Sequence, residues 1–180
     1  DGRIVSAVKE REYLEQLGIV LTSQFQFKIS KDREWHDFTC DGVPFNLKLT
    51  NCANTCDNAF NKTAVIYSVT GRMPKSKNMC FNQFWREIQE KPWEDLAGTE
   101  YHYLVVNKVT SEAMIKSIFD IHKYYKNPCN ILQVKWSHEF EHRDYKPTDL
   151  TEKKRELLRC IQASVRAAIE SQKDFADADI

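Results

Sequence analysis

The residues whose types are best suited to catalysis or metal binding lie between Glu34 and Thr50, in the stretch EWHDFTCDGVPFNLKLT. Asp41 and Gly42 are typical of a type I′ turn, because both central positions of that turn need a positive φ. A two-residue turn there places Asp37 opposite Asn46 on the neighbouring strand. The sequence therefore predicts a β-hairpin that presents a carboxylate and an amide side by side.

One face of this hairpin carries polar side chains and the other carries apolar ones. Lys48 follows Asn46 by two residues, so we expect both side chains on the same face. The opposite face would carry Phe38, Phe45 and Leu47, whose burial would hold the hairpin against a core. A carboxylate, an amide oxygen and an ammonium group in one cross-strand neighbourhood can bind a divalent metal and orient a water. An ordinary hairpin with a solvated charged face is the alternative.

The same residues carry a resemblance to a known family. Asp37, followed on the next strand by Asn46, one residue and Lys48, resembles the motif of the PD-(D/E)xK nuclease superfamily. In that motif an Asp is followed by an acid, one further residue and a Lys. His36 stands in place of the family's Pro and Asn46 in place of its second acid, although some restriction endonucleases of the superfamily carry an amide there. The resemblance implies a type II restriction endonuclease, which is a Mg²⁺-dependent enzyme that cleaves double-stranded DNA at a short sequence.

The resemblance also implies a role for each residue of the motif. Asp37, Asn46 and the backbone carbonyl of Leu47 would bind the metal, and Lys48 would orient or help to deprotonate the attacking water. Because an amide replaces a carboxylate at position 46, the site has one negative charge fewer. Either one metal suffices, or another acid joins the site, or position 46 holds an inactivating change. Two acids are candidates for the additional ligand: Glu12 and Asp57.

A set of polar and basic residues would contact DNA if the resemblance holds. They are Asn58, Asn61, Lys62, Arg72, Lys75, Lys77, Gln133 and Lys135. The three basic residues between positions 71 and 79 lie in a loop with little to bury them, so they are suited to phosphate contacts. A solvated turn would have the same composition. Enzymes of this kind usually cut both strands as two-fold dimers, so the resemblance implies a homodimer with double-stranded DNA as its partner.

Other chemistry is encoded in the same chain. Residues 138–142 read HEFEH and match HExxH, in which two His one helical turn apart bind zinc and the Glu activates water. The pattern follows a predicted strand and Pro147 limits any helix, so we expect a polar loop there rather than a zinc metallopeptidase. Cys52 and Cys56 with His138 and His142 have the ligand types of a structural zinc site. A DNA-binding domain of the same fold without cleavage is a further alternative, because the second acid is missing.

Length and composition set broad limits. The 180 residues, 42% of them hydrophobic, suit a single domain over residues 1–180 with a sizeable core. The 26 basic and 26 acidic side chains cancel, so no global field favours nucleic acid, although a local positive cleft suffices for a specific nuclease. The six cysteines do not have the close spacing of a disulfide framework in a secreted protein, so we expect free thiols. No stretch approaches 18 apolar residues, so we expect a cytoplasmic protein without a membrane partner, prokaryotic by the resemblance.

Apolar periodicity predicts the elements that must position these residues. We expect helices at 4–17, 57–69, 80–90, 111–122 and after 149, with strands at 24–30, 101–107 and 130–136 beside the hairpin. Asp57 and Ser111 would cap two of the helices, and Asp149 with Glu152 would form a capping box for the last. This order predicts an α/β (α+β) fold, and the resemblance implies a restriction-endonuclease-like core: a mixed sheet with helices on both faces.

Overall fold

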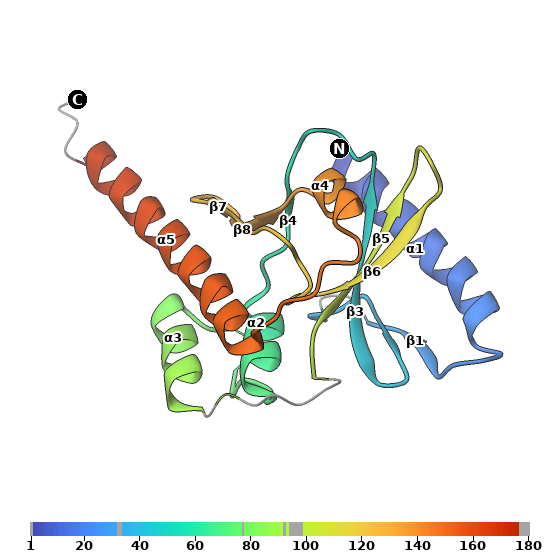
Figure 1. Cartoon of the computed structure of the whole chain (residues 1–180), viewed down its shortest axis with the longest axis horizontal. Coiled ribbons are helices and arrows are strands. Elements are labelled where there is room, and N and C mark those ends of the chain that lie inside the picture. Colours follow the sequence, from blue (N-terminus) through green and yellow to red (C-terminus); the bar gives the residue numbers. More distant parts are fainter. Residues whose placement is uncertain (1, 32–33, 77, 92, 94–98, 177–180) are drawn as a thin grey trace. The chain divides into compact units, whose positions relative to one another are not determined.

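The computed structural model describes residues 2–31, 34–76, 78–91, 93 and 99–176 (Figure 1). Residue contacts divide the chain into two compact units. The first unit comprises Asp1–Asn51 and Asn61–Ile118, and the second comprises Cys52–Phe60 and Phe119–Ile180. The single domain over residues 1–180 stays a prediction. Among the described residues, no helix is both long enough and apolar enough to cross a membrane.

The first unit is built on a five-stranded mixed sheet. Its strands, in spatial order, are β1 (Phe27–Ile29), β2 (Phe38–Cys40), β3 (Val43–Thr50), β5 (His102–Asn107) and β6 (Ala113–Ser117). The pairs β1–β2, β2–β3 and β5–β6 are antiparallel, whereas β3 and β5 are parallel. The helices of this unit are α1 (Gly2–Leu21), α2 (Lys62–Thr70) and α3 (Phe81–Glu90). The predicted α/β class with a mixed sheet is therefore confirmed.

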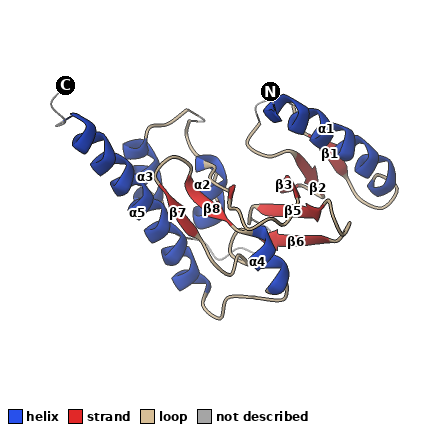
Figure 2. Ribbon diagram, turned by 90° about the horizontal axis from the view of Figure 1, so that it is seen from above, coloured by secondary structure: helices blue, strands red, loops and turns tan. Residues whose placement is uncertain are grey.

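The β2–β3 hairpin has the predicted turn. Asp41 and Gly42 have φ angles of 50° and 81°, and a type I′ turn requires both to be positive. The three residue pairs that join β2 to β3 are in the predicted register. The apolar face packs against α1, where Leu14 joins a buried cluster with Phe38 and Leu47. Figure 2 shows α1 lying along the side of β1, β2 and β3. The prediction that this face anchors the hairpin is confirmed.

Helix α2 lies on the opposite face of the sheet. Tyr103 is aligned with Asn46 in the parallel β3–β5 pair, so both side chains project on this face. The Tyr101 ring contacts that of Tyr103, and the Tyr101 backbone N–H donates to Ser68 Oγ of α2 at 2.9 Å. The sheet therefore lies between α1 on one face and α2 on the other.

The second unit combines a small sheet with two helices. Its antiparallel strands, in spatial order, are β4 (Asp57–Asn58), β8 (Ile131–Val134) and β7 (Tyr125–Asn127), and its helices are α4 (Trp136–Glu141) and α5 (Leu150–Ala176). The Asn127 N–H donates to Ser164 Oγ at 3.0 Å, which fastens β7 to α5. Asp149 caps α5 as predicted, because its Oδ1 accepts the N–H of Glu152 at 3.0 Å.

Several features of the predicted secondary structure are wrong. The helix expected at 111–122 is instead β6 with an irregular continuation, because Ser111 takes a φ of 59° in the turn from β5 and cannot cap a helix. α2 is capped by Asn61 rather than by Asp57, which lies in β4. The loop expected at 138–142 is mostly the helix α4, and β7 was not predicted. Long-range strand pairing overrides local periodicity at β6.

Candidate functional site

Asp37 lies directly before β2, and β3 fixes its side chain. Its Oδ2 accepts a hydrogen bond from the Leu47 backbone N–H at 2.7 Å. Burial raises the pKa of the Asp37 carboxyl, whereas the Leu47 N–H and the charges of Lys48 and His36 lower it, and burial prevails. A carboxylate has about four lone-pair sites, so this single hydrogen bond leaves capacity for a cation.

A local irregularity sets the direction of this carboxylate. The β2–β3 ladder ends where Phe38 is aligned with Phe45, and the Asp37 N–H also donates to the Phe45 carbonyl, at 2.8 Å. Asp37 and Phe38 therefore both lie opposite Phe45, as in a β-bulge. A β-bulge bends the strand and changes the direction of a side chain. The predicted direct pairing of Asp37 with Asn46 is wrong, because the bulge shifts Asp37 out of the regular register.

Asp37 and Asn46 nevertheless share one neighbourhood around Tyr101. Burial raises the pKa of Tyr101 well above its usual value, the charge of Asp37 raises it further, and an interaction with the Asn46 side chain lowers it. The Oδ1 atom of Asn46 is buried and has no hydrogen-bond partner within the described part of the chain. An unsatisfied buried oxygen costs about 1–3 kcal/mol. A bound cation would remove this penalty.

The remaining residues of the motif complete the set. The N–H and C=O of a strand residue point to the same edge of the strand, so the Leu47 carbonyl is directed to the side on which its N–H meets Asp37. Lys48 is half-buried, projects on the same face as Asn46, and is close enough to lower the pKa of Asp37. The hairpin thus carries the three oxygen atoms and the ammonium group that the motif predicts, and their binding of a metal stays a prediction.

Trp35 holds the backbone that leads to Asp37. Its carbonyl accepts hydrogen bonds from Asn61 Nδ2 at 3.2 Å and from the Tyr101 hydroxyl at 3.0 Å. Its ring stacks on Tyr101, with centroids 5.6 Å apart, and contacts Tyr67 of α2 at 5.3 Å. This support was not predicted from the sequence. A Trp two residues before the motif Asp was the available signal, but its partners are distant in sequence.

Of the two additional acids, Glu12 lies in the same unit as the hairpin and Asp57 in the other unit. Glu12 is exposed on α1 and lines a hollow together with Leu49 and Lys108. Leu49 alternates with Lys48 along β3, so this hollow lies on the α1 face of the sheet, away from Asn46. Asp57 belongs to the second unit, where it is aligned with Val134. The structure therefore places Glu12 outside the group formed by the motif residues.

Two of the predicted DNA-contacting residues have structural partners in the first unit. Asn61 is the N-cap of α2, and its Oδ1 accepts the N–H of Ala64 at 3.1 Å. The Lys62 ammonium donates to the Met79 carbonyl at 2.6 Å and lies 4.3 Å from the centroid of the Phe81 ring. Both side chains therefore have a role in the fold that does not require DNA.

The other predicted DNA contacts are distributed over the two units. Arg72 and Lys75 are exposed in the loop after α2, where Lys75 lies 3.7 Å from Glu90, and Lys77 lies outside the described residues. In the second unit, Asn58 Oδ1 accepts the N–H of Phe60 at 2.9 Å, Gln133 Oε1 accepts from Asn127 Nδ2 at 3.2 Å, and Lys135 directly precedes α4. Their contact with DNA stays a prediction.

The HExxH pattern does form a helix, but its glutamate is not directed to a water site. Glu139 is fully buried, and its carboxylate accepts the backbone N–H groups of His122 at 2.8 Å and Lys123 at 3.2 Å. It therefore fixes a loop, which is incompatible with the general-base role of a peptidase glutamate. Among the described residues, His138 and His142 group with His122 and not with Cys52 or Cys56.

Comparisons of the chain with protein-family models, with curated proteins and with solved structures gave no match. Its function must therefore be inferred from its own side chains.

Proposed function

We propose that the chain is a Mg²⁺-dependent endonuclease of the PD-(D/E)xK type that hydrolyses phosphodiester bonds in double-stranded DNA at a specific sequence. The observation that carries this proposal is the buried Asn46 Oδ1, which has no hydrogen-bond partner within the described residues and whose side chain shares the neighbourhood of Tyr101 with the Asp37 carboxylate. The five-stranded mixed sheet with α1 and α2 on opposite faces supports it further, because the family resemblance implies that arrangement.

The oxygen atoms of the hairpin fit Mg²⁺. This ion prefers oxygen ligands and is commonly held by one or two carboxylates while it keeps several waters. Asp37 would supply the carboxylate, with the Asn46 amide oxygen and the Leu47 carbonyl completing the protein ligands. When bound, Mg²⁺ would polarise the phosphate and make its bound water more acidic. The Leu47 N–H holds the Asp37 carboxylate in place through Oδ2.

Lys48 has the remaining chemical role. Its ammonium would donate to the attacking water, orient it toward phosphorus, and offset the negative charge that builds on the phosphate oxygens in the transition state. Trp35, bonded through its carbonyl to α2 and to Tyr101, would keep Asp37 in place while DNA binds. We propose that two copies act together as a homodimer, because two-fold symmetry matches a palindromic site.

The test is cleavage of long duplex DNA of mixed sequence, in Mg²⁺ and in EDTA. We expect discrete fragments that require Mg²⁺, and a rate at least about 100-fold lower in Asp37→Ala and in Lys48→Ala. Lys108→Ala removes an exposed lysine of the same unit and should cleave normally. Cleavage that survives both hairpin variants would move the active site elsewhere and overturn the proposal.

A DNA-binding domain that does not cleave is the second candidate, and the amide at position 46 favours it. Such a protein would bind duplex DNA equally well with Mg²⁺ and with EDTA and would yield no fragments. Asn46→Asp restores the missing carboxylate, so cleavage gained by this variant would show that the amide disables the hairpin site. Cleavage by the unchanged chain would exclude this candidate.

A further inference from the structure

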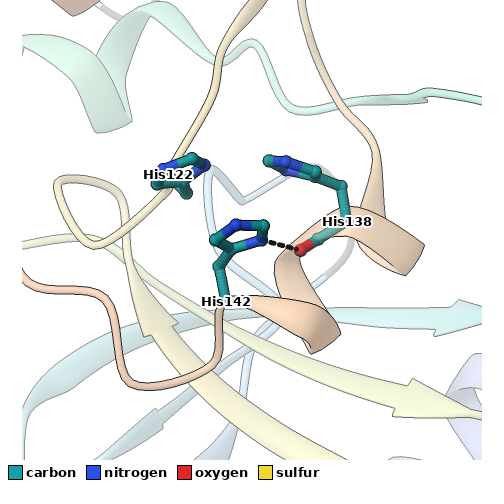
Figure 3. Close-up of side chains that lie close together, drawn as sticks. All are labelled: His122, His138 and His142. Atoms are coloured by element: carbon teal, nitrogen blue, oxygen red, sulfur yellow. Dashed lines mark hydrogen bonds between the residues drawn. The ribbon is translucent and has the colours of Figure 1, made fainter.

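Three histidines of the second unit converge on one point. His138 lies in α4, His142 directly follows that helix, and His122 lies in the segment before β7. One ring nitrogen from each lies within 4.8 Å of the others. Ring centroids are 4.1 Å apart for His122 and His142, and 4.2 Å apart for His138 and His142. Figure 3 shows the three imidazoles turned toward a common space, with His122 facing the two rings from α4 and its end.

The hydrogen bond of His142 fixes the tautomer of its ring. His142 Nδ1 lies 2.9 Å from the His138 carbonyl, which only accepts, so Nδ1 carries the proton and Nε2 has the lone pair (Figure 3). A backbone carbonyl that fixes the tautomer in this way commonly accompanies a metal-binding histidine. The Nδ1 atoms of His122 and His138 are buried, and within the described residues neither has a hydrogen-bond partner.

The backbone around His122 is held in place from two sides. Glu139 accepts the N–H groups of residues 122 and 123, and the Lys153 ammonium donates to the His122 carbonyl at 3.3 Å. The positive charge of Lys153 is balanced by Glu156 at 2.9 Å. The cluster is therefore pre-formed.

We propose that His122, His138 and His142 bind one Zn²⁺ ion, which cross-links the segment before β7 to α4. Imidazole suits Zn²⁺, whereas Mg²⁺ prefers oxygen, so this site is chemically distinct from the hairpin. Tetrahedral Zn–N bonds of about 2.0–2.1 Å place ligand nitrogens about 3.3 Å apart. The ligand nitrogens, which lie within 4.8 Å of one another, need to close to that separation when the ion binds. Three protein ligands leave a fourth position for water or another donor.

The site is tested with the full chain, without a histidine tag and after treatment with EDTA. Zn²⁺ titration by calorimetry should give one ion per chain, and Co²⁺ should give the intense visible absorption of a tetrahedral site. His122→Gln and His138→Gln should each weaken Zn²⁺ binding by more than about 100-fold, because loss of an outer-sphere partner alone costs 10–100-fold. The matched control His102→Gln, in β5 of the first unit, should bind Zn²⁺ normally, as should Asp37→Ala.

A second measurement does not depend on the folding of any variant. Diethyl pyrocarbonate modifies accessible histidine side chains, and the chain has five histidines. Zn²⁺ should protect residues 122, 138 and 142 of the unchanged protein, while His36 and His102 react at the same rate with and without the ion. If cysteines held the Zn²⁺ ion, each of the five histidines would react at the same rate with and without the ion, and the proposal would be overturned. The absence of stoichiometric binding would also overturn it.

Discussion

Asn61 connects the start of α2 to the backbone that precedes Asp37, and two substitutions separate its two contacts. Its Oδ1 accepts the Ala64 N–H at 3.1 Å, and its Nδ2 donates to the Trp35 carbonyl at 3.2 Å. Asn61→Asp keeps an oxygen for the cap but removes the donor to Trp35. Asn61→Ala removes both contacts. The difference in the free energy of unfolding between the two variants therefore gives the contribution of the N-cap.

The expected losses follow from these two contacts. Loss of an N-cap costs about 1 kcal/mol. Loss of the hydrogen bond to Trp35 costs about 0.5–1 kcal/mol, because the carbonyl keeps the Tyr101 hydroxyl as a partner. We therefore expect Asn61→Ala to lower the free energy of unfolding by about 2 kcal/mol, and Asn61→Asp by half of that or less. Looser support of Trp35 should also slow Mg²⁺-dependent cleavage in Asn61→Asp without weakening duplex binding.

Urea unfolding followed by circular dichroism at 222 nm measures both free energies, and an unchanged m-value shows that the midpoints can be compared. Two results would refute the reasoning. A loss in Asn61→Asp equal to that in Asn61→Ala would mean that the cap contributes nothing. An unchanged stability with weaker duplex binding in both variants would mean that Asn61 contacts DNA instead of supporting Trp35.

Two further predictions concern side chains away from the hairpin. The pKa of Glu87 is lowered by Lys91, so this nearly buried pair stabilises the fold above the unfolded-state pKa of Glu and loses its effect as the pH falls. Glu87→Gln should cost about 1.5 kcal/mol in urea unfolding at pH 7 and less at pH 3, and an equal cost at both pH values would indicate packing instead. The N–H of Gln83 lowers the pKa of the exposed Cys80, whereas burial raises that of Cys160 to about 11. Iodoacetamide at pH 7.5 should therefore label Cys80 first and Cys160 last by peptide mass spectrometry, and equal rates would contradict this order.

Local signals in the sequence were sufficient for the hairpin. An Asp-Gly turn and alternating side chains determine the pairing within a few residues, so the turn at Asp41 and the buried face with Phe38 and Leu47 were predictable. The bulge at Asp37 was not, because no turn residue marks it. It results from the fit between β2 and β3 at the end of their ladder.

Contacts between distant residues decided the features that the sequence did not reveal. The apolar spacing of residues 113–119 fits a helix as well as a strand, and pairing with β5 selects the strand. His122 lies 16 residues before His138, inside the segment predicted as that helix, so nothing local connected the two. The usable signal was the HExxH pattern itself, which supplies two metal ligands and therefore implies a third elsewhere in the chain.

The division of the chain affects how the protein can be cut. Residues 52–60 belong to the second unit but are encoded between β3 and α2 of the first, and β4 within them pairs with β8. A truncation after residue 118 would thus leave β4 without its neighbouring strand while it removed α4 and α5. To express the hairpin-bearing unit separately, a gene must also replace residues 52–60 with a short linker. A protease that cuts once between residues 51 and 61 would leave both units present but would break the first into two chains.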